Sequence, residues 1–168
     1  MKILVIVDMQ NDFLTGSLAN KEACKIVPKI VELAKDYDHL FFTRDSHDSN
    51  YLNTAEGKAL PIKHCIKGTN GWEIVNELVS LNPNTICFDK ETFGSIELAE
   101  CLSTMKNLDE VTVCGTCTDI CVISNVLLLK TYMPELKINV KADCCAGSSN
   151  FKHEAALSVM QSCQINII

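Results

Sequence analysis

An acid, a lysine and a cysteine each follow a short apolar run of the sequence, and together they could form a nucleophilic site. The three residues are Asp8, Lys90 and Cys121. A carboxylate can accept the proton of a thiol, the thiolate can attack a carbonyl carbon, and an ammonium can hold both groups in register. Each residue also has a simpler interpretation: Asp8 as the cap of a strand end, Lys90 as a solvated side chain and Cys121 as a small core residue.

The residues around Cys121 favour a reactive thiol. The segment Gly115–Cys121 precedes an apolar stretch that we expect to be a buried helix, with Thr118 as its N-cap. Cys121 would then lie in the first helical turn, where free N–H groups, the positive helix end and a nearby lysine favour a thiolate. The same N–H groups could stabilise an oxyanion.

A second group of candidate residues lies in the segment 44–71, which is long, polar and weakly periodic. Such segments in compact domains are usually functional or mobile. This one contains Asp45, His47, Glu56 and His64. Mixed nitrogen and oxygen donors suit a divalent transition metal with positions left for water or substrate. The alternative is a polar surface loop with unrelated histidines, because no closely spaced histidine pair is present.

Short β-branched runs alternate with helical patterns, and these are the elements that must position the candidate residues. The expected strands are Ile3–Val7, Leu40–Thr43, Thr85–Phe88, Val111–Cys114 and Ile138–Lys141, with a sixth at Gln164–Ile167. They are nearly continuous apolar runs, which is typical of strands covered on both faces. The alternation predicts one three-layer α/β/α domain over residues 1–168, with a mostly parallel sheet of five or six strands.

Apolar residues at helical spacing mark the helices between these strands. The expected stripes are Ala23, Ile26, Val27, Ile30, Val31 and Ala34; Trp72, Val75, Leu78 and Val79; and Phe151, Ala155, Val159 and Met160. Pro28 is expected to delay the start of the first of these helices. The stretch from Val122 to Leu129 is apolar on most sides, which predicts a central, buried helix.

The predicted sheet brings the two candidate groups together. In open parallel sheets, ligands bind beyond the carboxyl ends of the strands. Asp8, Asp45 with His47, Lys90 and the segment Gly115–Cys121 all follow predicted strands, so they should meet at this edge.

Composition excludes several classes of protein. The chain has 168 residues, of which 47% are hydrophobic and 21% charged, and this is ordinary for a globular domain. A net charge of −6 argues against a general polyanion binder, so nucleic acid is not an expected partner. The first apolar run is too short for a signal peptide or a membrane span, and we expect a soluble cytoplasmic protein.

Ten cysteines without a secretion signal indicate reduced thiols rather than a disulfide framework. Cys114, Cys117 and Cys121 also allow a metal or cluster fragment, but the cysteines do not form two matched C-x-x-C pairs. Asp119 and Asp143 fit either a supporting role at the site or loop caps.

Three motifs resemble the isochorismatase-like cysteine hydrolases, in that family's order and spacing and over almost the whole chain. Residues 7–13, VDMQNDF, resemble its D-x-Q-N-D-F opening; Lys90 falls at the position of its lysine; residues 115–122, GTCTDICV, resemble its nucleophile motif. Within the superfamily, Asp45-x-His47 and residues 63–69, KHCIKGT, are most similar to the nicotinamidases.

The resemblance implies the isochorismatase-like hydrolase fold and a catalytic triad of Asp8, Lys90 and Cys121. It also implies a cis peptide bond between Thr116 and Cys117, which would direct the N–H groups of Cys117 and Cys121 into an oxyanion hole. The implied reaction converts nicotinamide to nicotinate and ammonia through a thioester at Cys121, a step of NAD salvage.

The resemblance further implies a divalent metal that binds the pyridine nitrogen, with zinc expected first and manganese or iron as alternatives. The family often has a third histidine where this sequence has Asn53, and we expect Glu56 to complete the ligand set of Asp45, His47 and His64. It also often has a pocket tryptophan where this sequence has Pro61.

Phe13 and Phe93 remain as candidates for the aromatic wall of the pocket, although either could belong to the core. The loss of the tryptophan leaves the substrate open.

Two other functions remain as alternatives. One is a related cysteine hydrolase of another small amide or acyl compound, and the other is a non-catalytic thiol protein for redox sensing or binding. The family is often oligomeric, which allows a homo-oligomer, but no patch in the sequence establishes one. Metal content, a substrate panel and thiol alkylation distinguish these possibilities.

Overall fold

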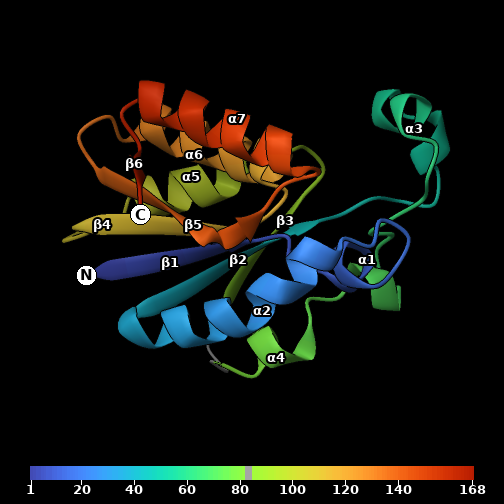
Figure 1. The fold of residues 1–168 in the computed structure, drawn as a ribbon, viewed down its shortest axis with the longest axis horizontal. Coiled ribbons are helices and arrows are strands. Elements are labelled where there is room, and N and C mark those ends of the chain that lie inside the picture. The colour runs from blue at the N-terminus through green and yellow to red at the C-terminus, as the bar shows by residue number, and fades with distance from the viewer. Residues whose placement is uncertain (82–84) are drawn as a thin grey trace.

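A six-stranded parallel sheet forms the centre of the computed structural model, which describes residues 1–81 and 85–168 (Figure 1). The strand order is β3-β2-β1-β4-β5-β6, and every pairing is parallel. The strands are β1 (Lys2–Val7), β2 (His39–Asp45), β3 (Ile86–Lys90), β4 (Glu110–Thr116), β5 (Lys137–Ala146) and β6 (Asn166–Ile167). All six predicted strands are therefore present, with somewhat different ends.

Helices cover both faces of this sheet. In Figure 1, α2 (Lys21–Leu33) and α4 (Asn76–Val79) lie on one face, and α5 (Ile96–Ser103), α6 (Ile123–Tyr132) and α7 (Asn150–Ser162) on the other. Two short helices, α1 (Asn11–Leu14) and α3 (Ala55–Ala59), lie beyond one end of the strands. The predicted three-layer α/β fold is confirmed.

The central strands and α6 form the core. Residues Ile3–Val7 of β1 have no solvent exposure, as expected for a strand covered on both faces. In α6, Asn125, Val126 and Leu129 are buried and no residue from Ile123 to Lys130 is exposed. The prediction of a central, buried helix is confirmed.

Two helix predictions were wrong. Pro28 does not delay α2, which begins at Lys21 because the Asn20 side chain accepts a hydrogen bond from the Glu22 N–H and caps the helix there. The stripe that starts at Trp72 is not one helix. A 3-10 turn (Asn70–Trp72) is followed by a β-bridge between Ile74 and Gln10, and the backbone turns into α4 only afterwards.

The buried face of α7 also differs from the predicted stripe. Phe151 is 82% exposed and Val159 is 49% exposed, whereas Ala156, Leu157 and Met160 are buried. Only Met160 of the predicted stripe faces the core. The helix packs against β5 and β6 at the edge of the sheet, beside α6, so residues at several helical positions remain in solvent.

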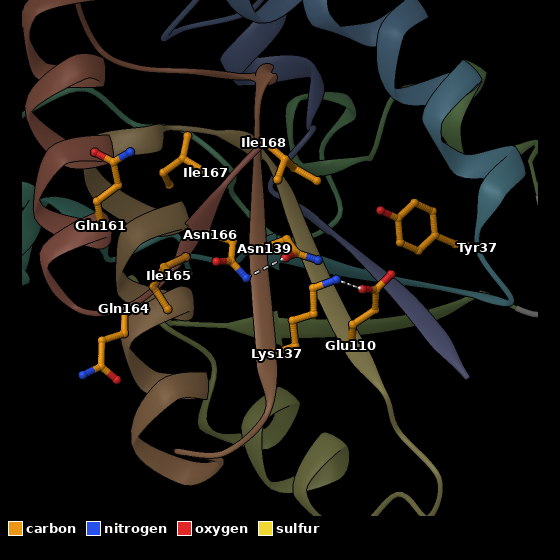
Figure 2. A pocket seen from close by; sticks show the side chains of 10 residues that line it. All are labelled: Tyr37, Glu110, Lys137, Asn139, Gln161, Gln164, Ile165, Asn166, Ile167 and Ile168. Atoms are coloured by element: carbon orange, nitrogen blue, oxygen red, sulfur yellow. Dashed lines mark hydrogen bonds and ion pairs between the residues drawn. The ribbon is translucent and has the colours of Figure 1, made fainter.

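A polar hollow lies near the amino ends of β4, β5 and β6 (Figure 2). It contains the ion pair of Lys137 with Glu110 at 2.7 Å and a hydrogen bond from Asn166 to Asn139. Its lining includes no cysteine or histidine. Because the chemistry-bearing residues follow the carboxyl ends of the strands, this hollow is not the candidate site.

The helices in the described ranges are all too short or too polar to cross a bilayer.

Candidate functional site

Asp8, Lys90 and Cys121 lie together at the carboxyl edge of the sheet. The Lys90 Nζ is 2.7 Å from Asp8 Oδ2 and 3.5 Å from the Cys121 Sγ. All three side chains are buried. The structure thus brings the acid, the lysine and the thiol that the sequence singled out into one cluster.

Strand register explains why these residues meet. Val7, the last residue of β1, is level with Thr43 of β2 and with Gly115 of β4. Asp8 follows directly, with a φ of 49°, and its Oδ1 accepts a hydrogen bond of 2.6 Å from the Thr43 hydroxyl. Sequence reasoning missed Thr43, because it lies inside an apolar strand and its partner is 35 residues away.

Burial and charge set the protonation of the cluster. Burial raises the pKa of the Cys121 thiol, and the charge of Asp8 raises it further. Burial also raises the pKa of Asp8, although the Lys90 ammonium opposes that shift. Burial by itself would lower the pKa of Lys90. The interactions with Asp8, Cys121 and Asp45 have the larger effect and raise this pKa.

The direction for Cys121 is opposite to the sequence-based expectation of a thiolate favoured by the helix end and the lysine. The physical reason is that the thiol is buried beside a carboxylate. The resting cluster is therefore a neutral thiol next to the Asp8–Lys90 ion pair. Because its pKa is raised, Asp8 is a stronger base than an exposed carboxylate would be.

The backbone between β4 and α6 carries Cys121 into this cluster. The predicted cis peptide bond between Thr116 and Cys117 is present. A π-helical turn (Thr118–Val122) follows, with Cys117 rather than Thr118 at its N-cap position. The prediction of Thr118 as N-cap was wrong, because its hydroxyl instead lies 2.8 Å from the His153 Nδ1 of α7.

Neighbouring elements hold this turn in place. Asp119 accepts hydrogen bonds from the N–H and the hydroxyl of Ser148, at 2.7 and 2.6 Å. The Asn125 amide donates to the Cys121 carbonyl at 2.8 Å, and its Oδ1 accepts from the Ser95 N–H. Asp119 therefore connects the nucleophile turn to the loop after β5, whereas Asp143 forms an ion pair with Lys141 at 3.1 Å.

Gly115 lets β4 approach β1 at the start of this segment. Its φ is +117°, and a Cβ at this position would lie 2.2 Å from the Val7 carbonyl oxygen. We expect Gly115→Ala to lower the free energy of unfolding by about 3 kcal/mol or more, measured by urea denaturation. Gly68→Ala is the matched control, since Gly68 has a φ of +80° and open space around its Cβ, and it should cost about 1 kcal/mol. Equal losses in the two variants would show that the contact with Val7 is unimportant.

Asp45, His47, Glu56 and His64 form a second cluster beside the first. One donor atom from each lies within 4.8 Å of the others. His47 Nε2 is 2.9 Å and His64 Nε2 is 3.4 Å from Asp45 Oδ2, and both are 3.8 Å from Glu56 Oε1. Within the described ranges, this is the only group of at least three such donors; Cys114, Cys117 and Cys121 do not form one.

The cluster fits a divalent cation. His47 Nε2 is buried, and although Asp45 Oδ2 lies 2.9 Å away, the described residues give it no hydrogen bond of good geometry, which is costly unless a further group binds it. Burial by itself would raise the pKa of Asp45. The interactions with the His47 and His64 side chains and the charge of Lys90 have the larger effect and hold this pKa well below the usual range, so Asp45 is an anion. Two imidazoles and two carboxylates are donors that zinc accepts.

Several residues orient these donors. The His64 Nδ1 lies 2.8 Å from the Ile62 carbonyl, so it donates there and leaves Nε2 facing the cluster. Tyr51 is buried, and its ring centroid lies 4.6 Å from that of His47 and 5.0 Å from that of His64. The hydroxyl of Tyr51 donates to the Leu60 carbonyl, which ties the ring to the opposite side of the loop.

The run at residues 7–13 supplies positioning contacts that sequence reasoning did not assign. The Gln10 amide donates to the Asp45 carbonyl, and its oxygen accepts from the Asp45 N–H, both at 2.8 Å. Asp12 accepts from the Cys65 N–H at 2.7 Å, beside His64. The polar residues of this run were a signal for these contacts, but their partners lie 35 and 53 residues away in the sequence.

A cavity of about 600 Å³ opens onto both clusters. Asp45, Glu56, His64 and Cys121 contribute to its lining, as do Cys117 and the apolar residues Phe13, Leu18, Ala19, Ala59, Leu60, Phe93 and Ile120. Phe13 is 9% exposed and its ring centroid lies 5.8 Å from that of His64, whereas Phe93 is 46% exposed. The structure thus places both candidate aromatics on the cavity wall, and brings the thiol and the four-donor cluster to one cavity.

All ten cysteines are free thiols, as expected from the composition.

Comparison with known proteins gives one family over nearly the whole chain. The model of the isochorismatase domain matches residues 2–168. The chain is 29% identical to an isochorismatase family protein of Bacillus subtilis, over 94% of this chain and 92% of that protein. It is 26% identical to the nicotinamidase/pyrazinamidase of Mycobacterium tuberculosis, over 100% of this chain and 98% of that protein.

A solved structure agrees with these sequence relatives. The pyrazinamidase of Pyrococcus horikoshii in complex with zinc superposes with a TM-score of 0.86 at 28% identity, over 99% of this chain and 98% of that one.

Proposed function

The chain belongs to the isochorismatase family, and we propose that it is a metal-assisted nicotinamidase that converts nicotinamide to nicotinate and ammonia. The observation that carries this proposal is the single cavity that is lined both by Cys121 and by Asp45, Glu56 and His64 of the four-donor cluster. A nucleophile next to a base suits attack on a carboxamide. The names of the relatives from Mycobacterium tuberculosis and Pyrococcus horikoshii support the same substrate class.

In the proposed mechanism, Asp8 accepts the proton of the Cys121 thiol as the sulfur attacks the carboxamide carbon. The N–H groups of Cys117 and Cys121 stabilise the tetrahedral oxyanion. Asp8 then gives the proton to the leaving nitrogen, the carbon–nitrogen bond breaks, and ammonia departs from a thioester at Cys121. Asp8 next takes a proton from water, whose oxygen attacks the thioester carbon, and the proton returns to the sulfur as nicotinate leaves.

Lys90 positions the Asp8 carboxylate and the Cys121 thiol relative to each other. Its ammonium lies between the Asp8 carboxylate and the Cys121 sulfur, so it can stabilise negative charge on either group as the proton moves. The rise of the Asp8 pKa by burial matches the task of a base that takes a proton from a buried thiol.

Asp45, His47, Glu56 and His64 would hold the metal, with zinc first and manganese or iron as alternatives. The bound cation would supply a Lewis acid for the ring nitrogen of nicotinamide and so orient the amide toward Cys121. Glu56 would take the place of the third histidine that the family often has, because it shares the cluster with both histidines, whereas Asn53 is exposed.

A related cysteine hydrolase of another small amide is the second candidate function. Pro61, at the position of the family's pocket tryptophan, is exposed and does not belong to the lining of the cavity. One wall therefore lacks the ring that would restrict the pocket to a flat pyridine.

The test is ammonia release from nicotinamide by the purified protein, together with metal analysis of the same sample. We expect rapid release and about one divalent metal per chain. Release of ammonia only from other amides would favour the second candidate. Absence of hydrolysis across a panel of carboxamides by metal-loaded protein would refute both.

His64→Ala should lower metal content, because it removes one of four donors and opens the buried side of the cluster. We expect KM for nicotinamide to rise by about tenfold or more, whereas the rate of Cys121 alkylation by iodoacetamide should change much less. His39→Ala, which changes an exposed histidine at the start of β2, is the control and should keep wild-type metal content. Full metal content in His64→Ala would exclude His64 as a ligand.

A further inference from the structure

Two lysines lie at the mouth of the cavity that holds Cys121. Lys21 is the first residue of α2, and Lys152 lies in the first turn of α7; both line the cavity and both are exposed. They come from opposite faces of the sheet. The active-site cavity therefore has a positively charged rim built by two separate elements.

Neither lysine has an acidic partner among the described residues. The lysines with such a partner are Lys2, Lys25, Lys35, Lys67, Lys90, Lys137 and Lys141. Lys21 and Lys152 differ from the other lysines without an acidic partner because both line the cavity that holds Cys121. Their charges are available to a ligand.

Hydrogen bonds fix the backbone that carries these lysines. Asn20 caps α2 and also donates to the Gly147 carbonyl at 2.9 Å, which ties the start of α2 to the loop before α7. Ser149 caps α7 by accepting from the Lys152 N–H. The positive ends of both helices add to the field of the two ammonium groups.

The acidic groups near the cavity offset this charge only in part. Asp45 and Glu56 belong to the four-donor cluster, where a divalent cation would offset them. Asp119 keeps its negative charge, but its carboxylate faces Ser148, from which it accepts two hydrogen bonds. Lys152 also acts on the cavity wall: burial raises the pKa of the Cys117 thiol, the charges of Asp119 and Asp8 raise it further, and the Lys152 ammonium opposes that rise.

We propose that the cavity prefers amides that carry a carboxylate at the end away from the scissile bond, and that Lys21 and Lys152 bind this carboxylate. The inference rests on the proposed amidohydrolase function and specifies its substrate class. A volume of about 600 Å³ is within the range of roughly 300–1,000 Å³ that accommodates drug-sized ligands, so a single ring leaves room toward the mouth.

The experiment compares kcat/KM for nicotinamide with that for its derivatives carrying a carboxylate at ring position 5 or 6. We expect at least one carboxylated amide to be hydrolysed about tenfold more efficiently than nicotinamide at low ionic strength, and the advantage to shrink with added salt. K21M/K152M should lose this advantage, about threefold for each lysine, while it keeps the rate for nicotinamide. The matched control is K29M/K106M, which removes two lysines outside the cavity.

The outcomes separate the two proposals. Equal or poorer hydrolysis of both carboxylated amides, with nicotinamide hydrolysed well, would overturn the lysine site and leave the amidohydrolase intact. An advantage that persists in K21M/K152M would also overturn it. If no amide is hydrolysed, the proposed function fails, and calorimetric binding of the carboxylated amides to wild type and K21M/K152M then decides the role of the lysines: equal affinities would refute it.

Discussion

Cys121→Ala is expected to abolish ammonia release while the fold remains intact. The substitution removes the only atom of this cavity that we assign as a nucleophile, so kcat should fall by about 10⁴ or more. The lost Sγ is small and its surroundings are packed, so the free energy of unfolding should change by about 1 kcal/mol or less. Steady-state kinetics and urea denaturation measure the two effects.

Cys24→Ala is the control for this variant, because Cys24 is an exposed thiol outside the cavity. It should keep wild-type turnover. Cys121→Ala should also retain its metal, since Cys121 does not belong to the four-donor cluster. Turnover by Cys121→Ala at the wild-type rate would mean that the thioester mechanism is wrong.

Asp8→Asn is expected to produce the second largest loss, with kcat lower by about 10³. The amide cannot accept the thiol proton, and Lys90 loses its 2.7 Å ion partner. Iodoacetamide should nevertheless alkylate Cys121 faster than in the wild type. Because burial and then the Asp8 charge raise the pKa of the thiol, removal of that charge lowers this pKa and increases the thiolate fraction near pH 8.

Opposite changes in turnover and alkylation distinguish a base from a structural residue. A variant that merely loosens the site would slow turnover without this specific gain in Cys121 reactivity. Thr43→Val is the matched control, because it removes the 2.6 Å hydrogen bond to Asp8 but keeps the carboxylate. It should lower kcat by about tenfold or less, and a loss as large as that of Asp8→Asn would argue against a base role for Asp8.

The sequence predicted the sheet and the meeting of the two clusters because both follow from the alternation of strands and helices along the chain. Continuous apolar runs marked the strands, and a parallel sheet places whatever follows each strand at one edge. Asp8, Lys90 and Cys121 could be placed together without knowledge of any side-chain geometry.

The sequence could not predict which long-range contacts orient the donors. Tyr51 contacts both histidines only because the loop folds back over itself, and Gln10, after β1, reaches Asp45 at the end of the neighbouring β2. Such contacts form only when segments distant in the sequence fold together, so they leave no periodic pattern of residues in the sequence. For the same reason Trp72, whose neighbours had helical spacing, lies in a turn that is followed by a bridge to Gln10.

The protonation state of the Cys121 thiol also could not be predicted from the sequence. A cysteine in a helical turn beside a lysine suggests a thiolate, but the sequence does not show how deeply the thiol is buried or how close Asp8 lies. In the folded chain burial dominates, and the pKa of Cys121 rises instead of falling.

Asp45 belongs to both clusters. Its Oδ2 faces His47 and His64, and its Oδ1 lies 3.6 Å from the Lys90 Nζ. A cation at the histidines therefore draws on the same carboxylate that helps to neutralise the lysine beside the thiol. Thermodynamic reciprocity then applies: whatever factor metal loading imposes on the affinity of Cys121 for a reversible thiol ligand, that ligand must impose on the affinity for metal. The affinity of the four donors for a cation and the affinity of Cys121 for such a ligand would thus be coupled through one carboxylate.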